Sequence, residues 1–156
     1  MLERDGKGLG DDSKADVKRI YKIDVARAQD VSSLSTEAAL LPRAVAKTLF
    51  LDIAAALKAT GLTTAQIPAK LEGMTFGEDV VVDGVVKHTL YVGNDNDFLP
   101  TTPGGLANPN QWFVFAFGPE DLGGSVFVNQ KIEPRRDGWG RGHGRDRDRD
   151  DDDRRR

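Results

Sequence analysis

The fold class is decided by Gln111-Trp112-Phe113-Val114-Phe115-Ala116-Phe117, a run of aromatic and β-branched residues. Such residues favour β-strands, and the Gly118-Pro119 pair that follows ends regular structure. On the N-terminal side, residues 100–109 are rich in Pro and Gly and predict a loop. We therefore expect a β-strand over residues 111–117, the strongest strand signal in the sequence.

Outward from this strand, two further runs predict a β-hairpin. Residues Leu71–Phe76 and Lys87–Gly93 both have the composition of strands, and a turn region around Asp83-Gly84 lies between them. Asp and Gly are favoured in turns. We expect the two runs to pair through this turn.

The N-terminal part of the chain predicts shorter elements. Residues Arg19–Val25 alternate apolar and polar side chains at strand spacing. Leu2–Gly6 has the pattern of the end of a strand that runs into a Gly-rich turn. One turn of helix is expected over Thr36–Leu41.

Residues 44–59 leave two alternatives open. Their Ala and Leu content is compatible with one long helix, whereas Lys47–Asp52 also has the pattern of a strand. We favour a strand to Leu51 and then a short helix over Ile53–Ala59. Asp52 is a good N-cap for that helix, and Gly61 is a suitable C-terminal stop.

Short strands separated by irregular loops predict an all-β sandwich or propeller rather than alternating βα units. The chain has 156 residues, of which 38% are hydrophobic, enough for one modest core. Residues 135–156 hold nine Arg and seven Asp with almost no apolar side chain, which predicts disorder. The expected organisation is one domain over residues 1–134 and a disordered C-terminal tail over residues 135–156.

Without that tail, the body of the chain is acidic. The 22 Lys and Arg residues less nine leave 13, and the 25 Asp and Glu residues less seven leave 18, so the body carries −5. Nucleic-acid binding needs a basic face and is therefore not expected. Cation binding is compatible with this charge.

Three features that the sequence lacks bear on its cellular compartment and on membrane contact. It has no cysteine, so disulfides and thiolate sites are excluded. No run approaches the ~20 apolar residues of a membrane helix, and no membrane partner is expected. The chain has no secretion signal, so a protein that starts at Met1 is expected in the cytoplasm.

Several familiar sites do not fit the sequence. Gly6–Gly10 is not followed by Lys-Ser or Lys-Thr, so a flexible turn is favoured over a phosphate loop. A Ser-His-Asp triad lacks its Gly-x-Ser-x-Gly turn, and His88 is interpreted as an exposed strand residue. Two isolated histidines without cysteine do not make a zinc site.

The candidate site is the acidic strand end, residues 93–98, which read Gly-Asn-Asp-Asn-Asp-Phe. Hard cations prefer such side-chain oxygens, and alternation would place Asp95 and Asp97 on one side. The alternative, favoured when the run is taken alone, is a turn in which these side chains bond the nearby backbone. Glu72 and Glu3-Arg4-Asp5 shift the balance, because three acidic segments could converge. Their own alternatives are an edge-strand charge and a solvated ion pair.

These segments together resemble a known family. The resemblance rests on Leu2–Gly6, Val17–Asp24, Lys70–Met74 and Leu90–Phe98. Their order and spacing are similar to the C-terminal part of the esterase-like activity of phytase (phytase-like) family. The resemblance implies a β-propeller-like fold, phosphoester hydrolysis, and export to the periplasm or the medium.

The resemblance also implies a set of site residues and a substrate class. The implied catalytic residues are Glu3, Arg4, Glu72 and Asp97. The residues implied to bind a divalent cation, best matched by calcium, are Glu72, Asp95, Asn96 and Asp97. The substrate would be a small phosphorylated or ester compound, with Arg4 pairing with phosphate and the cation polarising a phosphoryl oxygen.

The chain is too short for the family's whole ring. At ~40 to 45 residues per blade, residues 1–134 supply about two to three blades, whereas a closed ring needs about 4 to 8. We therefore expect a partial propeller-like fragment whose open sheet edges would be covered by the missing blades or another chain. The alternative function is a non-catalytic propeller module for binding or structure, inactive when isolated.

Overall fold

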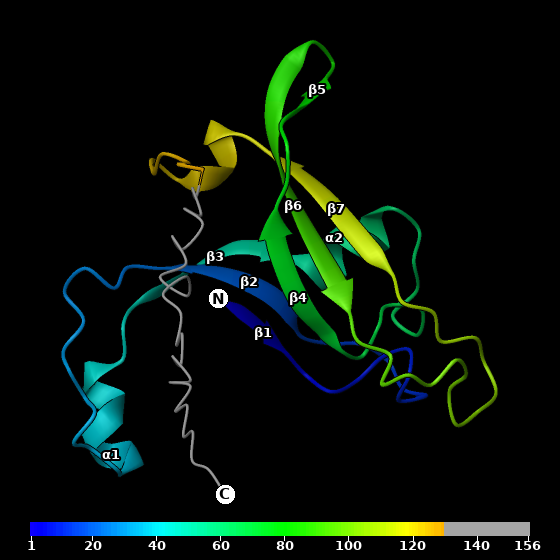
Figure 1. Cartoon of the computed structure of the whole chain (residues 1–156), viewed down its shortest axis with the longest axis horizontal. Coiled ribbons are helices and arrows are strands. Elements are labelled where there is room, and N and C mark those ends of the chain that lie inside the picture. Colours follow the sequence, from blue (N-terminus) through cyan, green and yellow to red (C-terminus); the bar gives the residue numbers. More distant parts are fainter. Residues whose placement is uncertain (130–156) are drawn as a thin grey trace, which may run out of the picture.

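The computed structural model describes residues 1–129, and the predicted tail over residues 135–156 lies outside them. The described residues form two antiparallel β-sheets with short helices around them (Figure 1). No helix among them is both long enough and apolar enough to cross a membrane. The predicted β-rich class is confirmed. A propeller is not established by two sheets and stays a prediction.

The first sheet comes from the N-terminal part of the chain. It contains β1 (Leu2–Arg4), β2 (Lys18–Ile23) and β3 (Lys47–Asp52), in that order. Between β2 and β3 lie α1 (Glu37–Leu40) and a 3₁₀ helix, Leu41–Arg43. The predicted strands and the helical turn are confirmed within a few residues.

The alternatives for residues 44–59 are decided in favour of a strand followed by a helix. Strand β3 runs directly into α2 (Ile53–Ala59), and the Asp52 carboxylate accepts a hydrogen bond from the Ala55 amide at 2.9 Å. That contact satisfies a helix N–H group that would otherwise lack a partner. One long helix is excluded, because Lys47–Asp52 pairs with β2.

The second sheet is built around β6 (Val85–Asn94). On one side of β6 lie β4 (Leu71–Phe76) and then β5 (Val80–Val82), and on its other side lies β7 (Trp112–Phe117). A 3₁₀ helix, Pro119–Leu122, follows β7. The sheet confirms the strongest strand prediction and places it beside the predicted hairpin.

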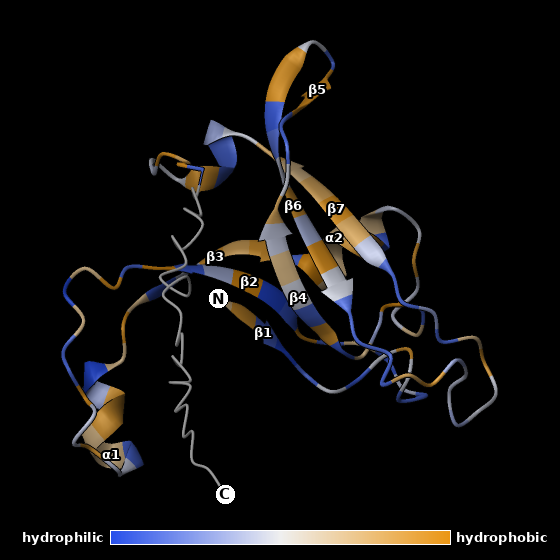
Figure 2. Ribbon diagram, viewed as in Figure 1, coloured by the Kyte–Doolittle hydropathy of each residue, from blue (hydrophilic) through white to orange (hydrophobic). Residues whose placement is uncertain are grey.

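The predicted hairpin forms, but it is longer than expected and interrupted. Its turn is at Asp83 and Gly84, with φ of 50° and 77°, the left-handed pair of a type I′ turn. Residues 77–79 interrupt the outer strand, where three residues face two on β6. At the tip, the valines of β5 and early β6 are exposed, and Figure 2 shows this hydrophobic end projecting from the sheet.

The hydrophobic core joins both sheets and α2. Strand residues that are almost fully buried include Ile20 of the first sheet and Leu90 and Val92 of the second. Helix α2 adds Ile53, and its other core side chains are Ala54 and Leu57. Burying a large aliphatic side chain contributes about 1.5–3 kcal/mol, so this shared core fixes the two sheets against each other.

A loop contact also ties the two sheets together near the candidate site. Leu9 forms a parallel bridge with Pro68, through hydrogen bonds of 2.8 Å from Leu9 N to Ile67 O and from Ala69 N to Leu9 O. Gly8 has φ of 130°, and a Cβ there would overlap Ile67 O. This close approach brings the end of β1 next to the start of β4.

Candidate functional site

The candidate site lies where the end of β1 meets the start of β4. The Arg4 guanidinium forms an ion pair with the Glu72 carboxylate across the two sheets. Glu72 is the extra residue of a β-bulge, because Leu71 pairs with Asn94 and Gly73 with Gly93. Bulges redirect side chains, and this one leaves Glu72 facing the other sheet.

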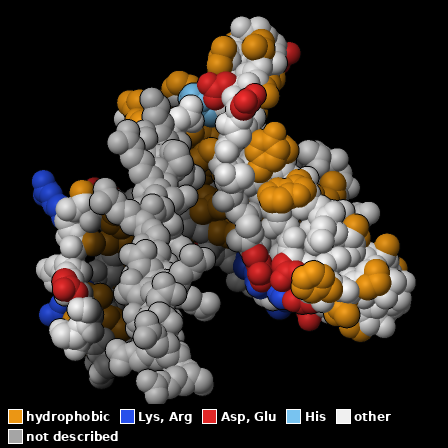
Figure 3. Space-filling model, viewed as in Figure 1, with side chains coloured by type: hydrophobic (Ala, Val, Ile, Leu, Met, Phe, Trp, Pro, Cys, Tyr) orange, Lys and Arg blue, Asp and Glu red, His pale blue; other side chains and the backbone are white. Residues whose placement is uncertain are grey.

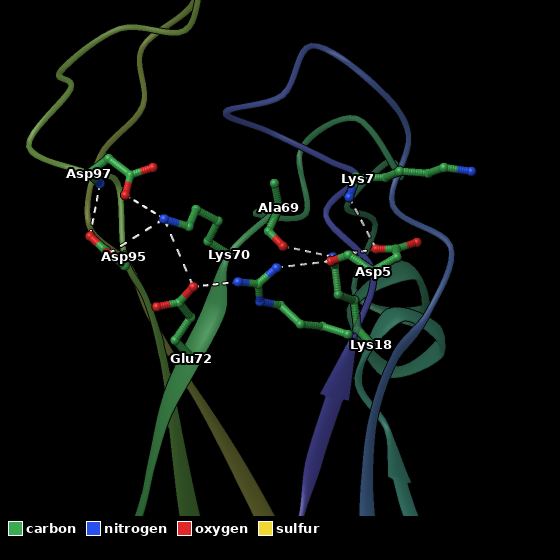
Figure 4. Close-up of polar contacts among 9 residues, drawn as sticks. Asp5, Lys7, Lys18, Ala69, Lys70, Glu72, Asp95 and Asp97 are labelled. Atoms are coloured by element: carbon green, nitrogen blue, oxygen red, sulfur yellow. Dashed lines mark hydrogen bonds and ion pairs between the residues drawn. The ribbon is translucent and has the colours of Figure 1, made fainter. Parts of the chain in front are cut away.

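Lys70 lies between Glu72 and the acidic strand end (Figure 4). Its ammonium bonds to the Asp97 carboxylate and lies 3.8 Å from an Asp95 oxygen and 4.0 Å from Glu72 Oε1. The hydrogen bond to Asp97 raises the pKa of Lys70, so this amine stays protonated. Three carboxylates therefore share one tethered cation.

The acidic strand end is a turn, as its alternative interpretation predicted. The Asp97 amide donates to Asp95 Oδ1 at 2.8 Å, and the Phe98 amide donates to Asn96 Oδ1 at 3.1 Å. Asp97 and Phe98 have φ of 54° and 59°, which is uncommon for such side chains. The turn and the acidic cluster are therefore one structure.

Two predicted site residues lie outside this cluster. Glu3 pairs with Lys47, whose amine is 2.6 and 2.8 Å from its two carboxylate oxygens. Asn96 donates to the Asn108 carbonyl at 2.9 Å and so holds the loop, and its predicted role in metal binding stays a prediction. The structure thus brings together Arg4, Glu72, Asp95 and Asp97, with Lys70 added; we call these five the charged cluster.

A protein-family comparison covers the whole charged cluster. The family model described as "Phytase-like: Esterase-like activity of phytase" matches residues 1–98. The chain belongs to the phytase-like family. The match runs from β1 through the acidic strand end and confirms the resemblance seen in the sequence. No curated protein and no solved structure matches the chain.

A second ion pair supports the phytase-like cluster from inside. Lys18 is fully buried, and its amine donates to Asp5 Oδ1 at 2.6 Å, to Asp5 O at 2.9 Å and to Ala69 O at 2.8 Å. Burial acts to raise the pKa of Asp5, but hydrogen bonds from Lys18 and from the Val17 and Asp16 amides outweigh it. The resulting pKa is about 2.

Sequence reasoning missed Lys70 and Lys18 as members of this region. Both were detectable from strand alternation. Lys70 and Glu72 flank Leu71, which is fully buried, so both point away from the core. Lys18 lies two residues before the buried Ile20 and therefore shares its inward face.

A divalent cation does not fit the arrangement of this phytase-like cluster. Within residues 1–129, no group of three or more Asp, Glu or His side chains is placed to hold one metal ion. The ammonium of Lys70 lies where the carboxylates of Glu72, Asp95 and Asp97 converge. A calcium ion at this cluster would have to displace the Lys70 ammonium. Calcium binding here stays a prediction.

Beside the cluster lies a small polar cavity of about 170 Å³. Its lining includes Lys70, Asp95 and Asp97, together with Gly6 and Gly10 of the β1–β2 loop. Figure 3 shows acidic and basic side chains gathered at this end of the second sheet, next to apolar loop residues. Through this cavity a small polar molecule can reach Lys70, Asp95 and Asp97, whereas Arg4 and Glu72 are outside its lining.

Proposed function

We propose that this phytase-like chain contributes to phosphoester hydrolysis and that the charged cluster binds the phosphate group. The observation that carries this proposal is the meeting of Arg4 and Lys70 with three carboxylates beside a polar cavity. The substrate class is a small phosphorylated or ester compound. The phytase-like family match over residues 1–98 also supports this proposal.

Arg4 and Lys70 supply complementary chemistry for a phosphate. A guanidinium donates two parallel hydrogen bonds to phosphate oxygens, and an ammonium adds a compact charge. Both would stabilise the negative charge that spreads over the phosphoryl oxygens during transfer. The raised pKa of Lys70 keeps this charge in place at neutral pH.

The carboxylates supply a proton acceptor. In the proposed reaction, water attacks phosphorus and the ester P–O bond breaks. The water proton passes to Asp97, which is released from Lys70 when the phosphate takes its place there, and then to the leaving alkoxide. This sequence uses residues of the chain alone.

The charge of the cluster sets a condition on this reaction. Two cations face three carboxylates, a formal balance of −1, and both cations are already paired within the chain. An incoming phosphate must replace a carboxylate on Arg4 or Lys70. We therefore expect weak substrate binding, because part of the binding energy is used to separate Glu72 from Arg4 or Asp97 from Lys70.

The test is phosphate release from phytate and from p-nitrophenyl phosphate by the full chain, with added calcium or with a chelator. Arg4→Ala should lower kcat/KM by about 100-fold or more, the usual effect of removing a donor to transition-state charge. Arg19→Ala is the matched control, because Arg19 pairs with Asp52 away from the cluster. Equal rates for wild type, Arg4→Ala and Asp97→Asn would overturn the proposal.

A second function, a non-catalytic module, is favoured by one observation. Every carboxylate of the cluster already has a partner in the chain, as expected for charges that only hold strand ends together. Asp97→Asn separates the two functions. Lost turnover at an unchanged melting temperature supports hydrolysis, whereas a lower melting temperature without any turnover in the wild type supports the structural module.

The proposal also includes a location. As a phytase-like hydrolase, the protein would act in the periplasm or outside the cell. Fractionation of cells that express the gene, followed by detection of the chain in the periplasm and medium, tests this location.

A further inference from the structure

A groove of about 780 Å³ lies between the two sheets, away from the charged cluster. Its walls come from β2, from Phe50 of β3, from Met74 and Phe76 of β4, and from residues 122–129 after β7. Ligand sites for small molecules have this size and a mostly apolar lining. None of the five residues of the charged cluster lines it.

The groove has an ordered aromatic wall. The Phe127 ring lies 4.8 Å from the Phe76 ring and 5.4 Å from the Phe117 ring, measured between centroids. Phe117 in turn meets Phe50 edge-on at 5.3 Å. The Phe127 contacts hold this segment against the second sheet, and Phe117 joins that sheet to Phe50 of the first, although Phe76 itself remains 51% exposed. An apolar ligand would cover surface that is now in contact with water.

The groove has one charged side chain in its described lining, that of Lys22, and no carboxylate. The Lys22 amine bonds to the Leu122 carbonyl and lies 3.5 Å from Ser125 Oγ, both on the segment that forms the rim. An ammonium has three donors. Met1 also lines the groove, and its N-terminal ammonium bonds to the Tyr21 carbonyl at 2.8 Å. The described lining thus offers an apolar surface with two positive charges, those of Lys22 and of the N-terminus, and no negative one.

We propose that this groove binds an anionic amphiphile, a molecule with an apolar body and one carboxylate or phosphate head. The body lies against Phe50, Phe76 and Phe127, and the head bonds to the Lys22 amine. The charge selects the ligand, because positive charge beside apolar walls, with no carboxylate in the described lining, is complementary to an anion and to no cation. This site is separate from the phosphate site and does not depend on the proposed hydrolysis.

The test uses a fluorescent fatty acid, 11-(dansylamino)undecanoic acid, and its uncharged methyl ester as a matched probe. Dansyl fluorescence rises when the probe leaves water, and titration of the full chain gives a Kd for each. We expect the acid to bind wild type at least about tenfold more tightly than the ester, as a charged hydrogen bond allows. Lys22→Met should remove most of this difference, and Lys22→Arg should keep most of it.

Two matched variants test the apolar part. Phe76→Ala should weaken both probes, whereas Phe98→Ala should change neither, because Phe98 is 98% exposed and outside the groove. Lys58→Met, an exposed lysine on α2, controls for loss of charge. Three results would overturn the proposal: no saturable binding by wild type, equal binding of acid and ester, or equal weakening of both probes by Lys22→Met.

Discussion

Asp5 and Lys18 form the most deeply buried ion pair in the described chain. Lys18 is fully buried, and its charge is compensated only by Asp5 and two backbone carbonyls. Removing one partner of a buried pair leaves an uncompensated charge, which costs about 3–5 kcal/mol. The pair lies between β1 and the segment before β4, so it supports the charged cluster from below.

The low pKa of Asp5 predicts a loss of stability in acid. The pKa is about 2 in the folded chain against a usual value of 3.8. The stabilisation is therefore complete above about pH 4 and is lost as pH falls towards 2, an effect of about 2 kcal/mol. Urea unfolding of the full chain between pH 5 and 2 measures it. Asp5→Asn should flatten this dependence, whereas Asp24→Asn, an exposed residue, should keep it.

Lys70 predicts how the charged cluster responds to calcium. In wild type its ammonium occupies the point where Glu72, Asp95 and Asp97 converge, so added calcium should raise the melting temperature little. Lys70→Met removes the cation that lies between the three carboxylates. Carboxylate oxygens are ligands that suit calcium. We expect a calcium-dependent rise in melting temperature in the variant alone. Lys58→Met is the control, and equal calcium responses in all three proteins would contradict this account.

Among the elements, the interrupted hairpin of β4, β5 and β6 depends on Gly77. A Cβ at this position would overlap the Tyr91 ring and lie 2.8 Å from Thr89 Oγ1. Thr89 is held by its hydrogen bond to the Glu78 carbonyl at 2.8 Å, so it does not yield freely. Gly77→Ala should therefore lower the unfolding free energy by about 1–3 kcal/mol, the usual cost of overpacking.

Gly73→Ala is the matched control for this hairpin. Gly73 lies on β4, just before the interruption that contains Gly77, and a Cβ there would meet no atom within 4 Å. Alanine also loses less backbone entropy than glycine on folding. Chemical denaturation should show Gly73→Ala as stable as wild type or slightly more stable, and equal destabilisation by both substitutions would refute the packing argument.

The same elements show what a sequence reveals and what it hides. The turn at Asp83-Gly84 and the helix after Asp52 were predictable, because turn and cap chemistry depends on residues adjacent in the chain. The bulge at Glu72 and the interruption at residues 77–79 were not, because a one-residue offset in pairing depends on the partner strand. Arg4, Glu72 and the acidic strand end were predicted to converge. The central cation Lys70 was missed, because its place among Glu72, Asp95 and Asp97 depends on how the start of β4 meets the acidic strand end.

Taken together, the two sheets are joined at three places around the candidate site. The Arg4–Glu72 ion pair, the bond from Lys18 to the Ala69 carbonyl and the bridge of Leu9 with Pro68 all cross from the first sheet and its loop to the start of β4. Exposed ion pairs contribute little, about 0–1 kcal/mol. The backbone bridge and the buried lysine therefore set the distance between Arg4 and Lys70, and hence the geometry of the charged cluster.

Gly8 tests whether that junction positions the cluster. Gly8→Ala places a Cβ against Ile67 O and 3.0 Å from Ala69 N, at a φ of 130° that alanine does not adopt readily. Since a backbone carbonyl cannot rotate away as a side chain does, we expect a loss of about 3 kcal/mol or more in urea unfolding. Hydrogen exchange should also quicken at the Leu9 and Ala69 amides, the two donors of the bridge. Gly6→Ala, which meets nothing within 4 Å, should leave both measurements unchanged. If Gly8→Ala left exchange at these two amides slow, the bridge would not be what holds the sheets in place, and the shared core alone would position Arg4 against Lys70.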